Sequence, residues 1–320
     1  MHPKFLRFVL ALSLLVPAGA ALAKDVHIEK RFPLAAGGDF VLKSSGGGVV
    51  VRGGSGSEAV VVITSNRDDF DKLYDVRFDA KPARLSVVVE RKNRSLFSWF
   101  GFSSGWVKVD VSLPRKVNAD VASSGGGLQI ANLQGTVKAD SSGGGVHIAD
   151  VDGNVILSSS GGGVVAEGVH GTVRAESSGG GVEIKNVSGG VHMESSGGPV
   201  VAANVGGDLE ASTSGGGVRI EEAHGMVVAD SSGGSVKVGF AAGNSRGGNL
   251  DSSGGGVAVT LDPSARLEID AASSGGRVSS DLPVAARGAV SKTSLKGTLN
   301  GGGAVLKLRS SGGGVSLAPR

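Results

Sequence analysis

The stretch SSGGGV at residues 141–146 recurs along the chain, and its composition suggests two kinds of chemistry. A glycine-rich loop can cradle phosphate groups, but such a loop ends in Gly-Lys-Ser/Thr and leads into a helix. Here no lysine follows the glycines, and the alternation of Val146, His147 and Ile148 indicates a strand. Calcium-binding nonapeptide repeats carry Asp in their glycine turns, where this chain has Ser. Neither a phosphate loop nor a calcium-binding repeat is therefore predicted.

Other side chains with chemical potential do not converge. Acidic residues share one position before the serines and form the column Asp140, Glu176, Glu194, Asp230 and Asp251. Ser158 and Ser212 interrupt this column, which favours a solvated face over a cation site. His170 and His224 share another column but lie three repeats apart, too far to share a metal, and no nucleophile elbow accompanies the serines. We therefore expect no metal, no cofactor and no enzymatic activity. An enzyme that acts on glycans is kept as the third hypothesis, after the two binding roles given below.

An aromatic cluster is the strongest candidate for a binding site. The segment LFSWFGFSSGW at residues 96–106 holds five of the 13 aromatic residues of the chain, between two strand-like segments, and is expected to form a loop. This loop either folds back as a hydrophobic cap on the end of the fold or contacts a glycan, membrane or protein partner, since exposed apolar patches mark interaction sites. The candidate binding residues are Phe97, Trp99, Phe100, Phe102 and Trp106.

The elements that position these side chains follow from an 18-residue sequence repeat. Ser-Ser-Gly-Gly-Gly, or a one-letter variant, begins at residues 123, 141, 159, 177, 195, 213 and 231, continues at 252 and 273, recurs at 310 and has an isolated copy at 44. Apolar positions persist from repeat to repeat, whereas the residues between them vary freely, as in strands with one buried face. Each strand is expected to pair in parallel with its counterpart one coil away. The sequence predicts an all-β, single-stranded parallel β-solenoid with 18-residue coils.

The glycines and serines are assigned to the corners of the coils. One glycine column begins with Gly135, Gly153 and Gly171, and the Gly-Gly-Gly triplets form another. A tight corner requires a positive φ or a close approach of two backbones, and glycine tolerates both. The stacked serines are expected to hydrogen-bond from coil to coil along the solenoid axis.

Three segments are predicted along the chain. Residues 1–23 read as a signal peptide, with Lys4 and Arg7 before the apolar run 8–16 and ALA at 21–23. Residues 24–122 are expected to form an irregular β-rich N-terminal cap and the first coils, and residues 123–320 the regular solenoid with C-terminal closing strands. No later apolar run is long enough to span a bilayer.

Charge and cysteine content narrow the classes of partner. Two of the 32 basic residues lie in the leader, so 30 basic and 29 acidic residues leave the mature chain at +1. This near-neutral balance, without a block of Lys or Arg, argues against a nucleic-acid partner. The chain has no cysteine, which excludes disulfides and a lipoprotein anchor.

The whole pattern resembles a known family. A leader, a β segment ending in VDVSLP (109–114), Ser-Ser-Gly-Gly coils and the closing SLKGTLNGGGAVLKLRSSGGGVSL (294–317) are similar to the bacterial putative-adhesin family of β-solenoid domains. The resemblance implies an exported protein, periplasmic, surface-associated or secreted, with an adhesive role and a cell-surface, glycan or envelope-protein partner. The alternative hypothesis is a periplasmic scaffold or envelope-stress accessory protein that binds a membrane partner.

Overall fold

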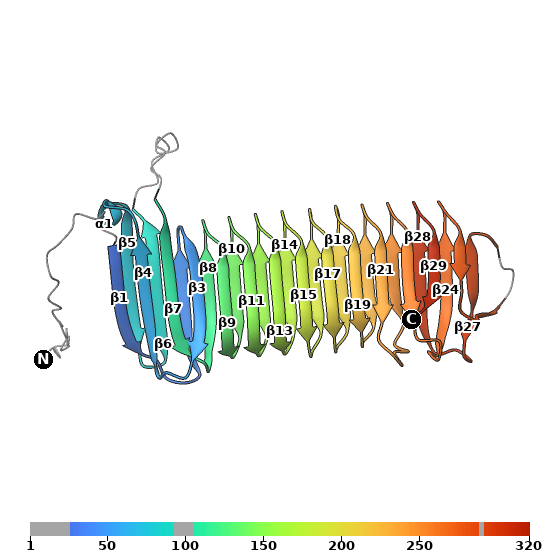
Figure 1. The fold of residues 1–320 in the computed structure, drawn as a ribbon, viewed down its shortest axis with the longest axis horizontal. Helices are drawn as coiled ribbons and strands as arrows, with labels where there is room; N and C mark the ends of the chain where they lie inside the picture. The colour runs from blue at the N-terminus through green and yellow to red at the C-terminus, as the bar shows by residue number, and fades with distance from the viewer. Residues whose placement is uncertain (1–25, 93–104, 288–290) are drawn as a thin grey trace, which may run out of the picture.

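The computed structural model describes residues 26–92, 105–287 and 291–320, which form a rod of stacked coils (Figure 1). Within these residues the strands make two sheets, one on each side of the rod: sheet A has 14 strands and sheet B has 15. The predicted β-solenoid is confirmed. No helix of the described part is long and apolar enough to cross a membrane.

Each repeat contributes one strand to each sheet. The strands of sheet A in the regular region are β9 (Leu128–Gln134), β11 (Val146–Asp152), β13 (Val164–His170), β15 (Val182–Val187), β17 (Val200–Val205), β19 (Val218–Ala223), β21 (Val236–Phe240) and β23 (Val257–Leu261). Those of sheet B are β8 (Val117–Ser123), β10 (Val137–Ser141), β12 (Val155–Ser159), β14 (Val173–Ser177), β16 (Val191–Ser195), β18 (Leu209–Thr213), β20 (Val227–Ser231) and β22 (Gly248–Ser252). Equivalent residues of successive coils pair in parallel, as Val146 does with Val164.

The predicted apolar columns form the core between the two sheets. Val146, Ile148 and Val151 from one strand and Val155 and Leu157 from the next are all buried, and the equivalent residues of the other coils repeat this pattern. Burying such a side chain stabilises the fold by about 1.5–3 kcal/mol. A single coil has no neighbouring coil to cover its apolar side chains along the axis. This stabilisation therefore exists only when coils stack.

The predicted serine ladder is present at the corners. Ser177 is buried; its hydroxyl donates to the carbonyl of Gly162 at 2.9 Å and accepts from the N–H of Gly180 at 3.0 Å. The same pair of bonds recurs at Ser141, Ser159 and Ser195. Each hydroxyl therefore ties its own corner to the preceding one.

The corner glycines are required by close approach rather than by a positive φ. A Cβ on Gly180 would lie 2.4 Å from the backbone nitrogen of Gly163 in the preceding coil. The first members of the other glycine column combine both causes: Gly153 has φ +149°, and a Cβ there would lie 2.1 Å from the carbonyl oxygen of Gly135. At these corners the backbones of successive coils are only one strand spacing apart, so no side chain fits between them.

A second column of left-handed residues, not predicted from the sequence, lies inside the strands of sheet A. Its members have φ between 53° and 67° and repeat every 18 residues: Asn132, Asp150, Gly168, Asn186, Asn204 and Glu222. Asn, Asp and Gly adopt this conformation at the lowest cost. The inserted residue shifts the alternation by one position, so that Val151 points inward again after Ala149 points outward.

The first strands fold over one another instead of stacking in sequence order. They are β1 (Val26–Pro33), β2 (Gly38–Ser44), β3 (Gly48–Gly54), β4 (Glu58–Ser65), β5 (Tyr74–Lys81), β6 (Arg84–Arg91) and β7 (Val107–Pro114), with the short helix α1 (Phe70–Leu73) before β5. The coil of β2 and β3 lies between that of β6 and β7 and that of β8 and β9. The isolated corner copy is thereby in register with the ladder, since Ser44 pairs with Ser123.

The last strands are interleaved in the same way. They are β24 (Leu267–Ser273), β25 (Val278–Ser280), β26 (Ala285–Ala286), β27 (Ser294–Leu299), β28 (Ala304–Ser310) and β29 (Val315–Pro319). The coil of β28 and β29 lies between that of β22 and β23 and that of β24 and β25. In space, the corner that begins at residue 310 thus stands between those at 252 and 273, which the linear order of the repeats does not indicate.

Both ends of the rod are closed by antiparallel strands. β4 pairs antiparallel with β1 and β7, β5 with β6, and β27 with β24 and β26. Between the outermost strands of the N-terminal end, the rings of Phe32 and Phe78 lie 5.3 Å apart and cover the last layer of the core. The purely parallel pattern therefore holds for the regular coils and not for the ends.

Candidate functional site

Only one residue of the predicted aromatic site can be placed. Phe97, Trp99, Phe100 and Phe102 lie outside the described residues. Trp106 directly precedes β7, and 49% of its surface is exposed.

The backbone of Trp106 is held from both sides. Its N–H donates to the Asn66 Oδ1 at 2.8 Å, and its carbonyl accepts from the hydroxyl of the buried Ser65 at 2.8 Å. Ser65 belongs to β4, which pairs with β7, so the anchoring group is part of the sheet. The indole is therefore presented to solvent on a fixed backbone.

A shallow groove of about 550 Å³ lies beside Trp106 on the outer face of sheet A. Side chains of β3, β7, β9 and β11 line it, among them Arg52, Lys108, Gln129 and His147. We call it the Trp106 groove. It combines one large apolar side chain with several hydrogen-bonding groups, the composition typical of a contact surface.

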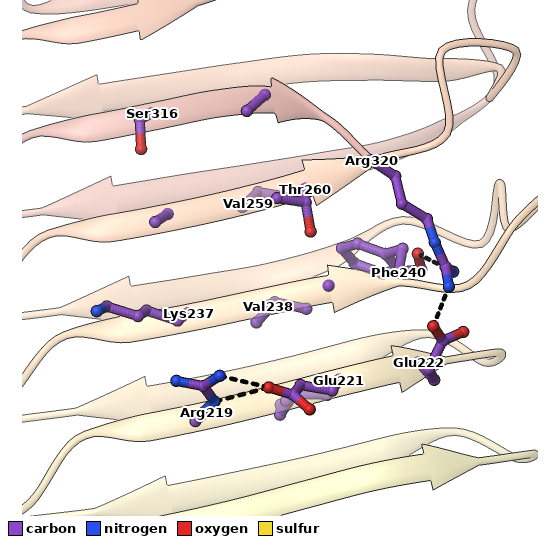
Figure 2. A pocket seen from close by; sticks show the side chains of 14 residues that line it. Arg219, Glu221, Glu222, Lys237, Val238, Phe240, Val259, Thr260, Ser316 and Arg320 are labelled. Atoms are coloured by element: carbon purple, nitrogen blue, oxygen red, sulfur yellow. Dashed lines mark hydrogen bonds and ion pairs between the residues drawn. The ribbon is translucent and has the colours of Figure 1, made fainter.

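A second groove, of about 440 Å³, lies on the same face near the other end of the rod (Figure 2). Outward residues of β19, β21, β23 and β29 line it, and we call it the C-terminal groove. Gly239, Ala258 and Ala318 give it a floor of small side chains. This groove was not predicted from the sequence, although the small residues stand in columns that carry long side chains in earlier coils, such as Glu183 and Lys185.

The wall of the C-terminal groove results from a change of register. Ala223 of β19 pairs with Phe240 of β21, so Glu221 and Glu222 on one strand face the single Gly239 on the next. Phe240 fills the core position that Ala223 holds in the preceding coil, and the left-handed column ends at Glu222. The long side chains of Glu221 and Glu222 on β19 thus border a point of β21 that carries no side chain.

Charged groups along the C-terminal groove are mostly paired. Arg219 donates to Glu221 Oε1 from Nε at 2.8 Å and from Nη2 at 2.6 Å. Figure 2 shows Arg320 reaching back from the end of β29, where its guanidinium donates to the Phe240 carbonyl at 3.3 Å and pairs with Glu222. Lys237 is exposed, and its ammonium has no hydrogen bond or ion pair with any described residue.

The predicted acidic column lies on the outer face of sheet B. Asp140 pairs with Lys138 at 3.1 Å. Partial desolvation raises the pKa of the Asp230 carboxyl on this exposed face, and the neighbouring Asp251 adds to the shift. Among the residues that the structure describes, no group of three or more His, Cys, Asp or Glu is arranged to hold a metal ion.

Comparison with known proteins identifies the family. The family described as Toastrack DUF4097 matches residues 40–318. The chain belongs to the Toastrack DUF4097 family. The resemblance to putative bacterial adhesins inferred from the sequence is thereby confirmed. No curated protein matches the chain.

Several solved structures are distantly similar to this member of the Toastrack DUF4097 family. A putative adhesin from Bacteroides fragilis is 13% identical with a TM-score of 0.36, over 92% of this chain and 97% of that one. A putative adhesin from Parabacteroides distasonis is 11% identical with a TM-score of 0.37, over 92% and 98%. A putative lipid binding protein from the same species is 10% identical with a TM-score of 0.36, over 91% and 96%. These similarities are too low to transfer a ligand to this chain.

Proposed function

We propose that this chain is an exported, non-enzymatic binding protein of the bacterial cell envelope, an adhesin-type solenoid that presents the outer face of sheet A to its partner. The half-exposed Trp106 on its anchored backbone carries the proposal. Export is supported by the composition of residues 1–23.

The physical argument rests on what the Trp106 arrangement gains on binding. A large aromatic side chain that stays in water in the free protein removes much apolar surface from water when a partner covers it. Because Ser65 and Asn66 already hold the Trp106 backbone by hydrogen bonds, little conformational entropy of this residue is lost in the complex. The sheet below it is continuous, since its strands pair along the whole rod.

Replacement of Trp106 tests the proposal. The purified mature chain is expected to bind intact bacteria or isolated envelope fractions, and Trp106→Ser is expected to weaken this binding at least about tenfold, as for an aromatic hot spot. Ile156→Ser is the matched control, because Ile156 is 42% exposed but lies on sheet B. A second variant, in which Trp99, Phe100 and Phe102 are replaced by Ser, tests the rest of the aromatic segment.

The outcomes separate the hypotheses. If both aromatic variants bind as the parent does, with unchanged thermal unfolding, this surface is not the contact site. Fractionation that places the protein in the periplasm, together with co-purification of one inner-membrane protein and no binding to cells, would support the scaffold alternative instead. Turnover in a polysaccharide screen would replace the proposal with an enzyme.

A further inference from the structure

The C-terminal groove holds polar groups that the fold itself does not use. In the described part of the chain, the ammonium of Lys237 and the hydroxyls of Thr260 and Ser316 have no partner, and all three residues are exposed and line the groove. They come from three adjacent strands, β21, β23 and β29. Strand spacing therefore spreads them over roughly 10 Å of the sheet surface.

Acceptors lie along the border of the same groove. Glu221 binds Arg219, and Glu222 binds Arg320, in each case through Oε1, so one oxygen of each carboxylate remains available to accept a hydrogen bond. The groove thus offers an ammonium donor, two hydroxyls that can donate or accept, and two carboxylate oxygens. A saccharide suits this mixture, because each of its hydroxyls can both donate and accept a hydrogen bond.

The shape of the floor fits a ring rather than a long side chain. Gly239, Ala258 and Ala318 leave the backbone of the sheet close to the surface, so a flat group can lie on it. The long side chains stand at the edges, with Arg219 and Glu221 on one strand and Arg320 crossing from the other side (Figure 2).

The net charge of the groove specifies the charge of the ligand. Arg219 and Arg320 are each neutralised by a glutamate, which leaves the single positive charge of Lys237. One carboxylate would satisfy this charge. A phosphate dianion would bring excess negative charge close to Glu221 and Glu222, which is unfavourable.

We infer that the C-terminal groove binds an acidic saccharide, with the carboxylate of a uronic acid on Lys237 and ring hydroxyls on Thr260, Ser316 and Glu221. This inference rests on the proposed function and names the ligand class of the same face of sheet A. It assigns Lys237 as the group that distinguishes an acidic sugar from its neutral counterpart.

Two disaccharides that differ at one group provide the test. Cellobiuronate and cellobiose are identical except that a carboxylate in the former replaces a hydroxymethyl group in the latter. The unmodified mature chain is expected to bind cellobiuronate at least about tenfold more tightly, measured by calorimetry or NMR titration, because a charge-assisted hydrogen bond to Lys237 is added. Lys237→Met is expected to abolish this preference.

Matched variants locate the effect. Lys307→Met removes an ammonium from β28, which belongs to the same coil as Ser316 but to sheet B, and is expected to leave the preference unchanged. Ala258→Phe fills the floor and is expected to weaken binding of both disaccharides. Ala258 is on the outer face, so this change leaves the core intact.

The inference would be overturned by no binding of cellobiuronate, by equal binding of both sugars, or by a preference that survives in Lys237→Met. Binding of inorganic phosphate that is stronger than that of cellobiuronate and is lost in Lys237→Met would show an anion site instead. If the unmodified chain binds cells but not cellobiuronate, the inference fails and the proposed function stands. If the unmodified chain does not bind cells, the proposed function itself is refuted.

Discussion

At the scale of single residues, the two serines of each corner have different roles despite their identical side chains. Ser177 is buried and links two coils through its hydroxyl, whereas Ser178 is exposed. Adjacent residues of a strand point to opposite sides, which accounts for the difference. The first serine of each pair is thus part of the core, and the second is part of the surface.

Removal of one ladder hydroxyl should therefore be costly. Ser177→Ala leaves the Gly162 carbonyl and the Gly180 N–H without this partner in a partly buried corner, and is expected to lower the free energy of unfolding by about 1–3 kcal/mol. Urea denaturation measures the change. Ser178→Ala serves as the control and is expected to stay within about 0.5 kcal/mol of the parent. Equal effects of the two substitutions would show that the ladder does not stabilise the fold.

At the scale of the strands, parallel in-register pairing places like residues side by side. This arrangement benefits the valines and serines, but it also brings equal charges together at strand spacing. Asp230 of β20 and Asp251 of β22 are register partners. Partial desolvation and the neighbouring carboxylate both disfavour the charged form of Asp230, which raises its pKa.

Neutralising Asp230 should consequently stabilise the protein in a pH-dependent way. The pKa in the folded state is above the ordinary value of 3.8, so the native state is penalised as pH rises through the window between these two values. Asp230→Asn is expected to raise the free energy of unfolding at pH 7, and the gain should vanish below about pH 3.8. Denaturant unfolding at pH 7 and pH 3 measures it.

Glu58→Gln, at the exposed first residue of β4, is the matched charge control for this experiment. It removes one negative charge without relieving a strand-to-strand repulsion. A gain at pH 7 that is the same in both variants would point to the net charge of the molecule and not to the Asp230–Asp251 pair.

At the scale of the whole molecule, both ends are locked by strands inserted out of sequence order. β28 lies between β22 and β24 although it belongs to the last 20 residues of the chain. Its amides and carbonyls are therefore bonded on both sides. A solenoid whose last strand was also its outermost strand would instead fray from that end.

Hydrogen exchange can detect this interleaving. The backbone amides of Leu306 and Leu308 in β28 are expected to exchange as slowly as those of β20 or β22. They should exchange more slowly than those of β26, whose one partner among the described strands is β27. Mass spectrometry of peptic fragments under native conditions would resolve these segments. Rapid exchange throughout residues 304–310 would contradict the interleaved order.

The sequence by itself determined the coil. Alternation of apolar residues and the 18-residue period predicted which side chains are buried, because a parallel ladder repeats the same environment at each coil. The corner serines were assigned correctly for the same reason. The left-handed column was visible only as a recurrence of Asn and Asp, and it was missed because such residues are also common at exposed positions.

The tertiary structure alone decided the order of the coils and the position of the C-terminal groove. Every Ser-Ser-Gly-Gly-Gly corner can stack on every other, so local sequence does not encode which coil lies next to which. The groove exists because Phe240 replaces a small core residue, ends the left-handed column and leaves Gly239 opposite two glutamates. Its lining combines residues as far apart in sequence as Arg219 and Arg320. Their proximity depends on long-range pairing that no single repeat specifies.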